Sequence, residues 1–195
     1  MNDFHYTPVP APQDDPALDP EAVWVFGYGS LMWRPGFEPA EIAAATLSGF
    51  HRDLCLISIH YRGTRDNPGL VCGLCDGGDC TGRALRIAPD DVPRVMKYLD
   101  DRELITKIYI PRHYHVTLAD GRKIAARVYV ADRTHEQYVG HWPDDRKVEH
   151  IVRAAGSEGR SFEYLENIVL HLRELGIHDT KMERLYTAAL AHAKA

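Results

Sequence analysis

The first strand and the first turn of this chain lie at residues 23–32, Val23-Trp24-Val25-Phe26-Gly27-Tyr28-Gly29-Ser30-Leu31-Met32. A short apolar run ahead of a Gly-rich break is typical of a buried strand. Glycines permit backbone conformations closed to other residues, and they let a ligand approach the main chain closely. Consecutive amide N–H groups in such a turn can bind a carboxylate or a phosphate. The stretch predicts either a tight turn or a binding loop, and the residues around Glu103 favour the loop.

The bulk properties narrow the class of protein. A chain of 195 residues fits one domain with a real core. The net charge of −5 argues against nucleic acid and anionic membranes as partners. No apolar run reaches membrane-spanning length, and residues 1–19 lack the basic start and apolar segment of a signal peptide. With four cysteines expected to stay reduced, we expect a cytoplasmic protein.

The chain divides into a tail and one domain. Residues 1–20 are rich in proline and aspartate and contain little that could be buried. Such composition cannot offset the entropy cost of ordering, so we predict that residues 1–20 are disordered. Residues 21–195 are predicted to form a single domain.

Short apolar segments with turn signals between them predict a curled sheet or a barrel. The turn Asp76-Gly77-Gly78-Asp79 predicts a hairpin between strands at 70–74 and 82–87, and Asp120-Gly121 predicts a second hairpin. The remaining predicted strands cover residues 54–59, 105–110, 114–119 and 123–130.

Helical periodicity appears between and after these strands. The predicted helices cover residues 90–102, residues 148–155 ending at Gly156, and a segment from Leu165 to Leu175 ending at Gly176. A capping box at Thr180-Lys181-Met182-Glu183 predicts the start of a last helix. The predicted class is therefore α+β, a small mixed β-barrel with flanking and C-terminal helices.

One carboxylate interrupts this pattern. The apolar stripe Val92, Val95, Met96 and Leu99 continues by one turn onto Glu103. A carboxylate on the core-facing side of a helix is costly unless it is paired or hydrogen-bonded. Glu103 is therefore either a solvated residue at a frayed helix end or a functional carboxylate facing a pocket, where it would act as a general base.

Four motifs follow one another along the chain, at Val25–Trp33, at Tyr61–Thr64 with Pro68-Gly69, at Tyr98–Glu103, and at Ala154–Leu165. Together they resemble the ChaC-type γ-glutamylcyclotransferases, which act on glutathione. The motifs stand in the order typical of that family and span nearly the whole chain after the tail. Leu104-Ile105-Thr106 stands where many members have a lysine and two glycines, which changes the loop after Glu103.

The resemblance implies the cyclotransferase barrel and the chemistry of an intramolecular aminolysis. The α-amine of a γ-glutamyl group attacks its own side-chain amide, which closes a lactam and releases Cys-Gly. It implies that Glu103 is the catalytic acid/base and that no cofactor or metal is required. The resemblance also implies a substrate-binding loop, formed by Gly27, Tyr28, Gly29, Ser30, Leu31 and Met32. Tyr28, Arg62 and Tyr164 are further candidates for a polar wall that recognises the substrate, since an arginine can pair with a carboxylate.

Other interpretations stay open at this point. The substrate could be a different γ-glutamyl amine or amino acid, or the chain could be a non-catalytic regulatory module. Cys72-x-x-Cys75 with Cys80 resembles part of a zinc site, but no fourth ligand is evident and the segment also fits a strand and turn. A regulatory role for Cys55 or the other thiols is unsupported. The expected partner is a small molecule, and no obligate protein partner is inferred.

Overall fold

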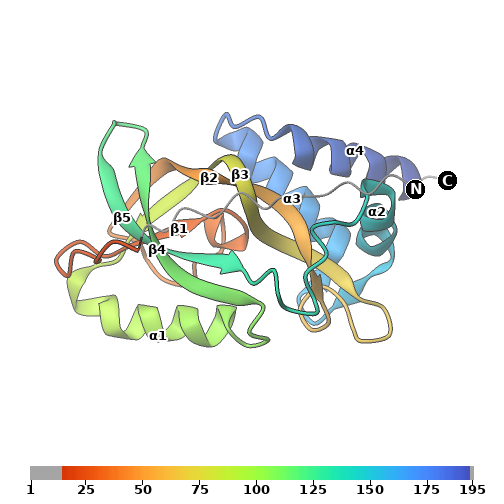
Figure 1. Ribbon diagram of the computed structural model, residues 1–195, viewed down its shortest axis with the longest axis horizontal. Helices are drawn as coiled ribbons and strands as arrows, with labels where there is room; N and C mark the ends of the chain where they lie inside the picture. Colours follow the sequence, from red (N-terminus) through yellow and green to blue (C-terminus); the bar gives the residue numbers. More distant parts are fainter. Residues whose placement is uncertain (1–14, 194–195) are drawn as a thin grey trace.

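A computed structural model describes residues 15–193, and it contains a closed barrel of five strands in the order β1-β3-β2-β4-β5 (Figure 1). The strands are β1 (Trp24–Gly27), β2 (Glu41–Ser58), β3 (Gly69–Arg86), β4 (Tyr109–Leu118) and β5 (Lys123–Ala131). Strand β1 pairs antiparallel with β3 and parallel with β5, so the barrel is mixed. The predicted α+β barrel is confirmed.

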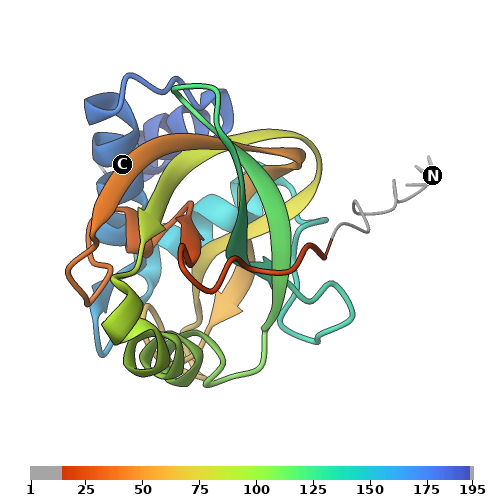
Figure 2. The ribbon, with the colours of Figure 1, turned by 90° about the vertical axis from the view of Figure 1, so that its left-hand side faces the viewer.

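Strand β1 is apolar along its whole length because both of its faces are covered. Trp24 and Phe26 point into the barrel core, whereas Val23 and Val25 belong to a second cluster beneath a helix. The sequence of a strand that is buried on both faces is a continuous run of apolar residues. Strand β1 thus has apolar neighbours on both faces, and the long strands curve around the barrel beside it (Figure 2).

The predicted hairpin at Asp76–Asp79 is wrong. Strand β3 runs through this segment without turning and pairs with β2 on both sides of it. The register shifts where Gly77 and Gly78, with φ of 87° and 75°, lie beside Gly49, with φ of 86°. Glycines with positive φ suit a β-bulge as well as a hairpin turn, and a bulge increases the local twist. Here they let two long strands curve around the barrel.

The second predicted hairpin is confirmed, with a different start. Strands β4 and β5 pair from Tyr109↔Ala131 to Thr117↔Lys123, and Gly121 has a φ of 91° in the turn. The segments predicted as strands at 105–110 and 114–119 form one strand that begins at Tyr109. Residues 104–108 form a turn instead, in which the Lys107 amide donates to the Leu104 carbonyl at 3.1 Å.

The helices lie where the periodicity predicts them, but the one predicted over residues 148–155 ends at Arg153, and Gly156 lies in a short strand instead of ending the helix. They are α1 (Val92–Glu103), α2 (Asp144–Arg153), α3 (Ser161–Glu174) and α4 (Thr180–Ala193), with the short strands β6 (Ala155–Gly156) and β7 (Gly159–Arg160) between α2 and α3. Short 3₁₀ helices occupy Ser30–Met32 and Pro89–Asp91. The predicted N-cap at Thr180 is wrong by one residue. Asp179 caps α4, because its carboxylate accepts from the Met182 amide at 3.1 Å.

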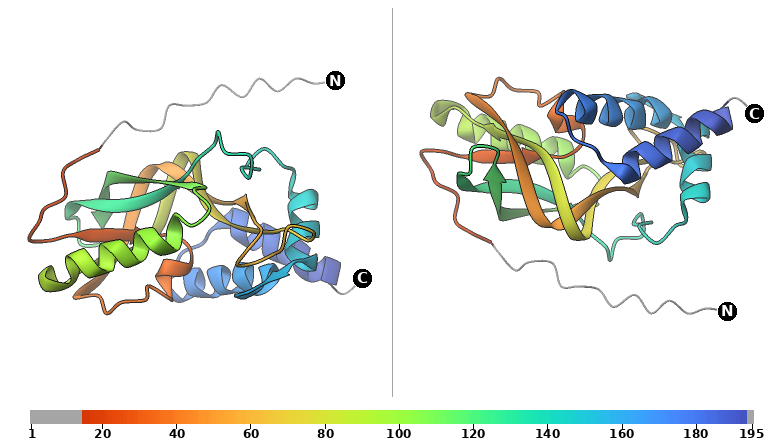
Figure 3. Two further views of the ribbon diagram at one scale, coloured as in Figure 1. Left: turned by 90° about the horizontal axis from the view of Figure 1, so that it is seen from below. Right: turned by 90° about the horizontal axis from the view of Figure 1, so that it is seen from above.

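The helices lie in two groups (Figures 1 and 3). Helices α2, α3 and α4 pack together at one end and share the barrel core, whereas α1 buries Val95 and Leu99 against Val25 and Tyr129. Within the described part of the chain, none of the helices has the length and the apolar character needed to cross a membrane.

Two buried charged residues on β2 join the barrel to the helices. The Asp53 carboxylate accepts from the Nζ atoms of Lys147 on α2 and Lys181 on α4, at 2.7 and 2.6 Å. Arg52 donates to the Tyr28 carbonyl at 2.5 Å and to the Asp179 carboxylate at 2.7 Å. Arg52 therefore fixes the end of β1 against the start of α4, which positions the loop that follows.

The N-terminal tail, residues 1–20, is only partly described. Residues 1–14 of the predicted disordered segment 1–20 lie outside the described residues. Residues 15–20 contact the barrel, since Leu18 packs on the cluster beneath α1 and the Asp15 carboxylate accepts from the His113 amide at 3.0 Å. The predicted disorder of the tail stays a prediction.

Candidate active site

Glu103 is the last residue of α1. The side chain is 16% exposed, and its Oε1 atom is buried without a hydrogen-bond partner among residues 15–193. The Nε atom of Arg102 lies 3.1 Å from this oxygen, as an ion pair without hydrogen-bond geometry. Burial raises the pKa of Glu103 above its ordinary value, and the Arg102 charge opposes that shift. A buried carboxylate with an oxygen that accepts no hydrogen bond is suited to accept a proton from a substrate.

A pocket of about 560 Å³ opens beside Glu103. It continues into a recess of about 30 Å³ whose walls are mainly buried side chains, among them Phe26, Tyr28 and Leu31. Four residues line both spaces: Ser30, Glu103, Tyr109 and Tyr164. The candidate base therefore lies where the pocket narrows into the recess.

The predicted binding loop follows β1 into this recess. Tyr28, Gly29, Ser30 and Leu31 line the recess, whereas Gly27 and Met32 line neither space. Gly27 ends β1 in register with Arg83, and Met32 is buried in the barrel core. The 3₁₀ helix begins after Gly29, and its first hydrogen bond runs from the Met32 amide to the Gly29 carbonyl at 2.9 Å. The amides of Ser30 and Leu31 therefore have no acceptor within that turn.

The expected reason for the glycines in this loop needs a correction. Neither Gly27 nor Gly29 has a positive φ, so conformational freedom of that kind does not explain them. Close approach does explain Gly29, because a Cβ atom there would lie 3.0 Å from the Tyr164 hydroxyl. A Cβ atom at Gly27 would lie 3.0 Å from the Cβ of Leu31. The loop is glycine-rich because other side chains pack directly on its main chain.

Arg102 connects Glu103 to this loop, and sequence reasoning missed it. Its guanidinium donates to the Ser30 hydroxyl at 2.8 Å, to the Arg34 carbonyl at 2.7 Å and to the Tyr98 hydroxyl at 3.3 Å. Arg102 directly precedes Glu103 in the sequence, and this was the signal that could have identified it as a site residue. Arg102 holds the end of α1 against the loop after β1, so the candidate base and the loop have a fixed relative position.

Tyrosine hydroxyls form the polar wall of the recess. Tyr28 donates to the Tyr129 carbonyl at 2.5 Å, and Tyr109 donates to the Cys72 carbonyl. The Tyr164 hydroxyl accepts from the Cys72 amide at 3.3 Å, which leaves its own proton for another acceptor. Burial raises the pKa of Tyr28, Tyr109 and Tyr164 well above the usual value, so these hydroxyls remain proton donors at neutral pH.

The second and fourth sequence motifs meet at the opposite wall. The turn between β6 and β7 lies on residues 60–62, where the amides of Ser157 and Glu158 donate to the carbonyls of His60 and Tyr61 at 3.1 and 2.9 Å. Arg62, one of the predicted binding residues, donates to the Glu158 carbonyl, and its guanidinium lies 5.3 Å from the centre of the Tyr164 ring. Arg62 and Tyr164 therefore line the pocket as one unit.

The suggested zinc ligands do not come together. Cys72 and Cys80 lie in the barrel core, whereas Cys75 packs with Cys55 in a separate cluster. Burial raises the pKa of Cys72 and Cys80, which opposes the thiolate form that zinc requires.

A different trio of potential metal ligands lies on β2 and β3. Within the described residues, His51, Asp53 and Cys75 bring one ligand atom each within 4.8 Å of one another. Asp53 already receives two ammonium groups, whose charge opposes a divalent cation. Independence from metal stays a prediction.

Comparison with known proteins places these features in a family. The sequence model of the ChaC-like proteins matches residues 23–191. The chain belongs to the ChaC-like family. The family includes a relative named glutathione-specific γ-glutamylcyclotransferase from Escherichia coli, which is 36% identical over 86% of this chain and 72% of its own length. A human relative named glutathione-specific γ-glutamylcyclotransferase 1 is 31% identical over 75% of this chain and 68% of its own length.

The fold of the family is seen in a solved structure. A yeast γ-glutamyl cyclotransferase specific to glutathione superposes with a TM-score of 0.81, covering 88% of this chain and 96% of that chain at 22% sequence identity. At this identity the likeness concerns the fold alone.

Proposed function

We propose that this chain is a γ-glutamylcyclotransferase that degrades glutathione to 5-oxoproline and Cys-Gly. The observation that carries the proposal is the buried carboxylate of Glu103, which has a raised pKa and, at the mouth of a recess, an oxygen that accepts no hydrogen bond from the described residues. Family membership supports the same reaction, since relatives of this chain carry that activity in their names.

The reaction needs a group that carries a proton, but it needs no nucleophile from the protein, because the nucleophile is the substrate's own amine. The substrate's α-amine nitrogen forms a bond to the γ-carbonyl carbon, and the bond from that carbon to the cysteine nitrogen breaks. Glu103 takes a proton from the attacking amine and then returns one to the departing cysteine nitrogen. Because its folded pKa is raised, the carboxylate is a stronger base than an exposed glutamate.

The recess supplies the rest of the proposed mechanism. The amides of Ser30 and Leu31, at the start of the 3₁₀ turn, bind the substrate's α-carboxylate or the developing oxyanion. The Tyr164 hydroxyl has a proton to donate beside them. Folding the glutamyl chain so that its amine faces its own carbonyl contributes several kcal/mol, because the reaction becomes an oriented intramolecular one.

Two finer statements belong to the same proposal. The reaction as written uses no cofactor, and we propose that the enzyme works without one. We also propose that it acts in the cytoplasm, where glutathione is abundant and thiols such as Cys55 stay reduced.

A direct assay tests this function. Purified protein is incubated with glutathione, and 5-oxoproline and Cys-Gly are quantified by chromatography. Equal amounts of the two products are expected. N-acetylglutathione should give neither, because its acylated nitrogen cannot attack. Release of Cys-Gly from the acetylated compound would replace cyclisation with hydrolysis, and γ-glutamyl amines turned over in preference to glutathione would change the substrate. Inertness toward every compound would favour a binding module.

A further inference from the structure

The pocket beside Glu103 contains three arginines, and they differ in how firmly they are held. Arg102 is fully engaged, since it donates to Ser30, Tyr98 and the Arg34 carbonyl and also pairs with Glu103. If Arg102 left these partners to bind a ligand, Glu103 would lose the ion pair that lies beside it.

Arg62 is also engaged. It is 9% exposed, donates to the Glu158 carbonyl and lies over the Tyr164 ring. Its amide donates to the Ser58 hydroxyl at 3.0 Å, so both its main chain and its side chain are tied to the pocket wall. Arg62 is therefore part of the wall that shapes the pocket.

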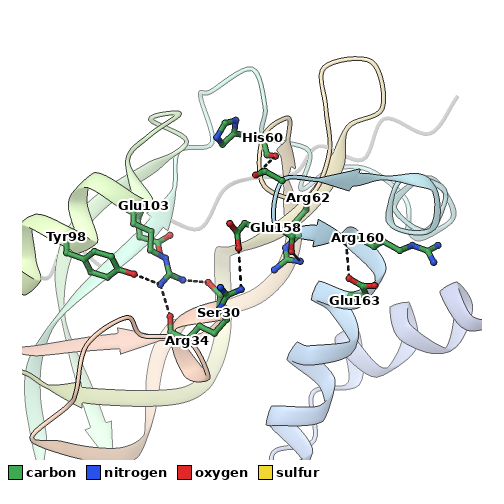
Figure 4. Close-up of polar contacts among 11 residues, drawn as sticks. Ser30, Arg34, His60, Arg62, Tyr98, Glu103, Glu158, Arg160 and Glu163 are labelled. Atoms are coloured by element: carbon green, nitrogen blue, oxygen red, sulfur yellow. Dashed lines mark hydrogen bonds and ion pairs between the residues drawn. The ribbon is translucent and has the colours of Figure 1, made fainter.

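Arg34 is different. Its side chain is 62% exposed, and its guanidinium pairs with the Glu158 carboxylate at 3.4 Å, while the Glu158 side chain is itself 45% exposed (Figure 4). The main chains of both residues are fixed, because the Arg34 amide donates to the Ser30 carbonyl at 2.8 Å and the Glu158 amide donates to Tyr61. An exposed pair of this length contributes little stability, so a ligand carboxylate can replace Glu158 at small cost.

We propose that Arg34 binds the carboxylate of the substrate's C-terminal glycine, and that Glu158 competes with that carboxylate for Arg34. The inference rests on the proposed function, which holds the γ-glutamyl end at Glu103 and the recess. The cysteine and glycine then extend by about 7 Å into the wider pocket. A carboxylate at that end requires a cation, and an arginine can bind it with two parallel N–H donors.

The test uses two substrates that differ only at this carboxylate. Glutathione is compared with its C-terminal amide in steady-state kinetics of the wild-type chain, Arg34→Gln and Glu158→Gln. Arg65→Gln is the matched control, because Arg65 is an exposed arginine that does not line the pocket and stands three residues after Arg62, which does. Melting temperatures confirm that each variant is folded.

The variants should respond with opposite signs. Arg34→Gln should raise KM for glutathione about two- to fivefold, the usual contribution of an exposed ion pair, with little change in kcat. Glu158→Gln should lower KM for glutathione about two- to fivefold, because the competitor is removed. Neither substitution should change kinetics with the amide, and Arg65→Gln should change neither substrate.

Two failures are distinguishable. Equal KM values of the wild-type chain for glutathione and its amide, or equal effects of Arg34→Gln on the KM of both substrates, would overturn this assignment and leave the proposed function intact. Inertness of the wild-type chain toward both compounds would overturn the proposed function and this inference together.

Discussion

Replacing Glu103 with glutamine separates its chemistry from its packing. Glutamine has nearly the same size and keeps an oxygen near Arg102, but it cannot accept the amine proton. Turnover should fall by about two to four orders of magnitude, the usual contribution of a positioned acid/base. That loss corresponds to about 3–5 kcal/mol of transition-state stabilisation. KM should change much less, because the loop at Tyr28–Leu31 is untouched.

Stability should respond in the opposite direction. Burial raises the folded pKa of Glu103 above its unfolded value, so the ionised carboxylate destabilises the fold at pH values above that raised pKa. The destabilisation is absent below the unfolded pKa of about 4.3. Glu103→Gln should therefore be as stable as the wild-type chain or more stable at neutral pH, with the difference vanishing in acid. In the wild-type chain, kcat/KM should fall as pH drops through the raised pKa, and the variant should lack this limb.

The assay measures 5-oxoproline formation by the folded variant, with melting temperature measured over the same pH range. Asp101→Asn is the matched control, because Asp101 lies on the same helix and pairs with Lys97 at 2.6 Å on its exposed face. Asp101→Asn should retain wild-type turnover. A folded Glu103→Gln protein with near wild-type turnover would refute the reasoning, because Glu103 would then be a buried residue without a role in the reaction.

Four further perturbations test the loop, the buried charges, the tail and the chemistry. Gly29→Val should reduce kcat/KM at least tenfold, because its Cβ would lie 3.0 Å from the Tyr164 hydroxyl, and normal kinetics would show that the loop tolerates a side chain. Asp53→Ala should destabilise the fold by about 3–5 kcal/mol in chemical denaturation, because Lys147 would remain buried without its counter-ion; a loss below 1 kcal/mol is the contrary result. Deletion of residues 1–14 should leave turnover unchanged, since every site residue follows Gly27, and a large fall would give the tail a function. Chelators should not affect turnover, and loss of activity together with stoichiometric zinc would make the His/Asp/Cys trio a metal site.

Local sequence was sufficient wherever one face of an element determined its structure. The stripe through Val95 and Leu99 predicted α1 and pointed to Glu103, because a carboxylate in apolar register has few structural explanations. Asp120-Gly121 predicted the β4–β5 turn because Gly121 adopts a positive φ there. Gly176, with φ of 67°, ends α3 for the same local reason.

Contacts between distant segments decided the rest. Gly77 and Gly78 have the same local conformation in a bulge as in a turn, and only pairing with β2 around Gly49 made them a bulge. Likewise, Thr180 and Asp179 both suit an N-cap, and Asp179 was selected by its ion pair with the buried Arg52.

The same distinction applies to the candidate site. The sequence by itself determined the family, the barrel and the candidate base, because these depend on local motifs and on the periodicity of one helix. Tertiary structure brought Arg102 to Ser30, Tyr109 and Tyr164 to Cys72, and Arg34 to Glu158. Those partners are separated by 37 to 124 residues in the chain, and their contacts depend on how the barrel closes.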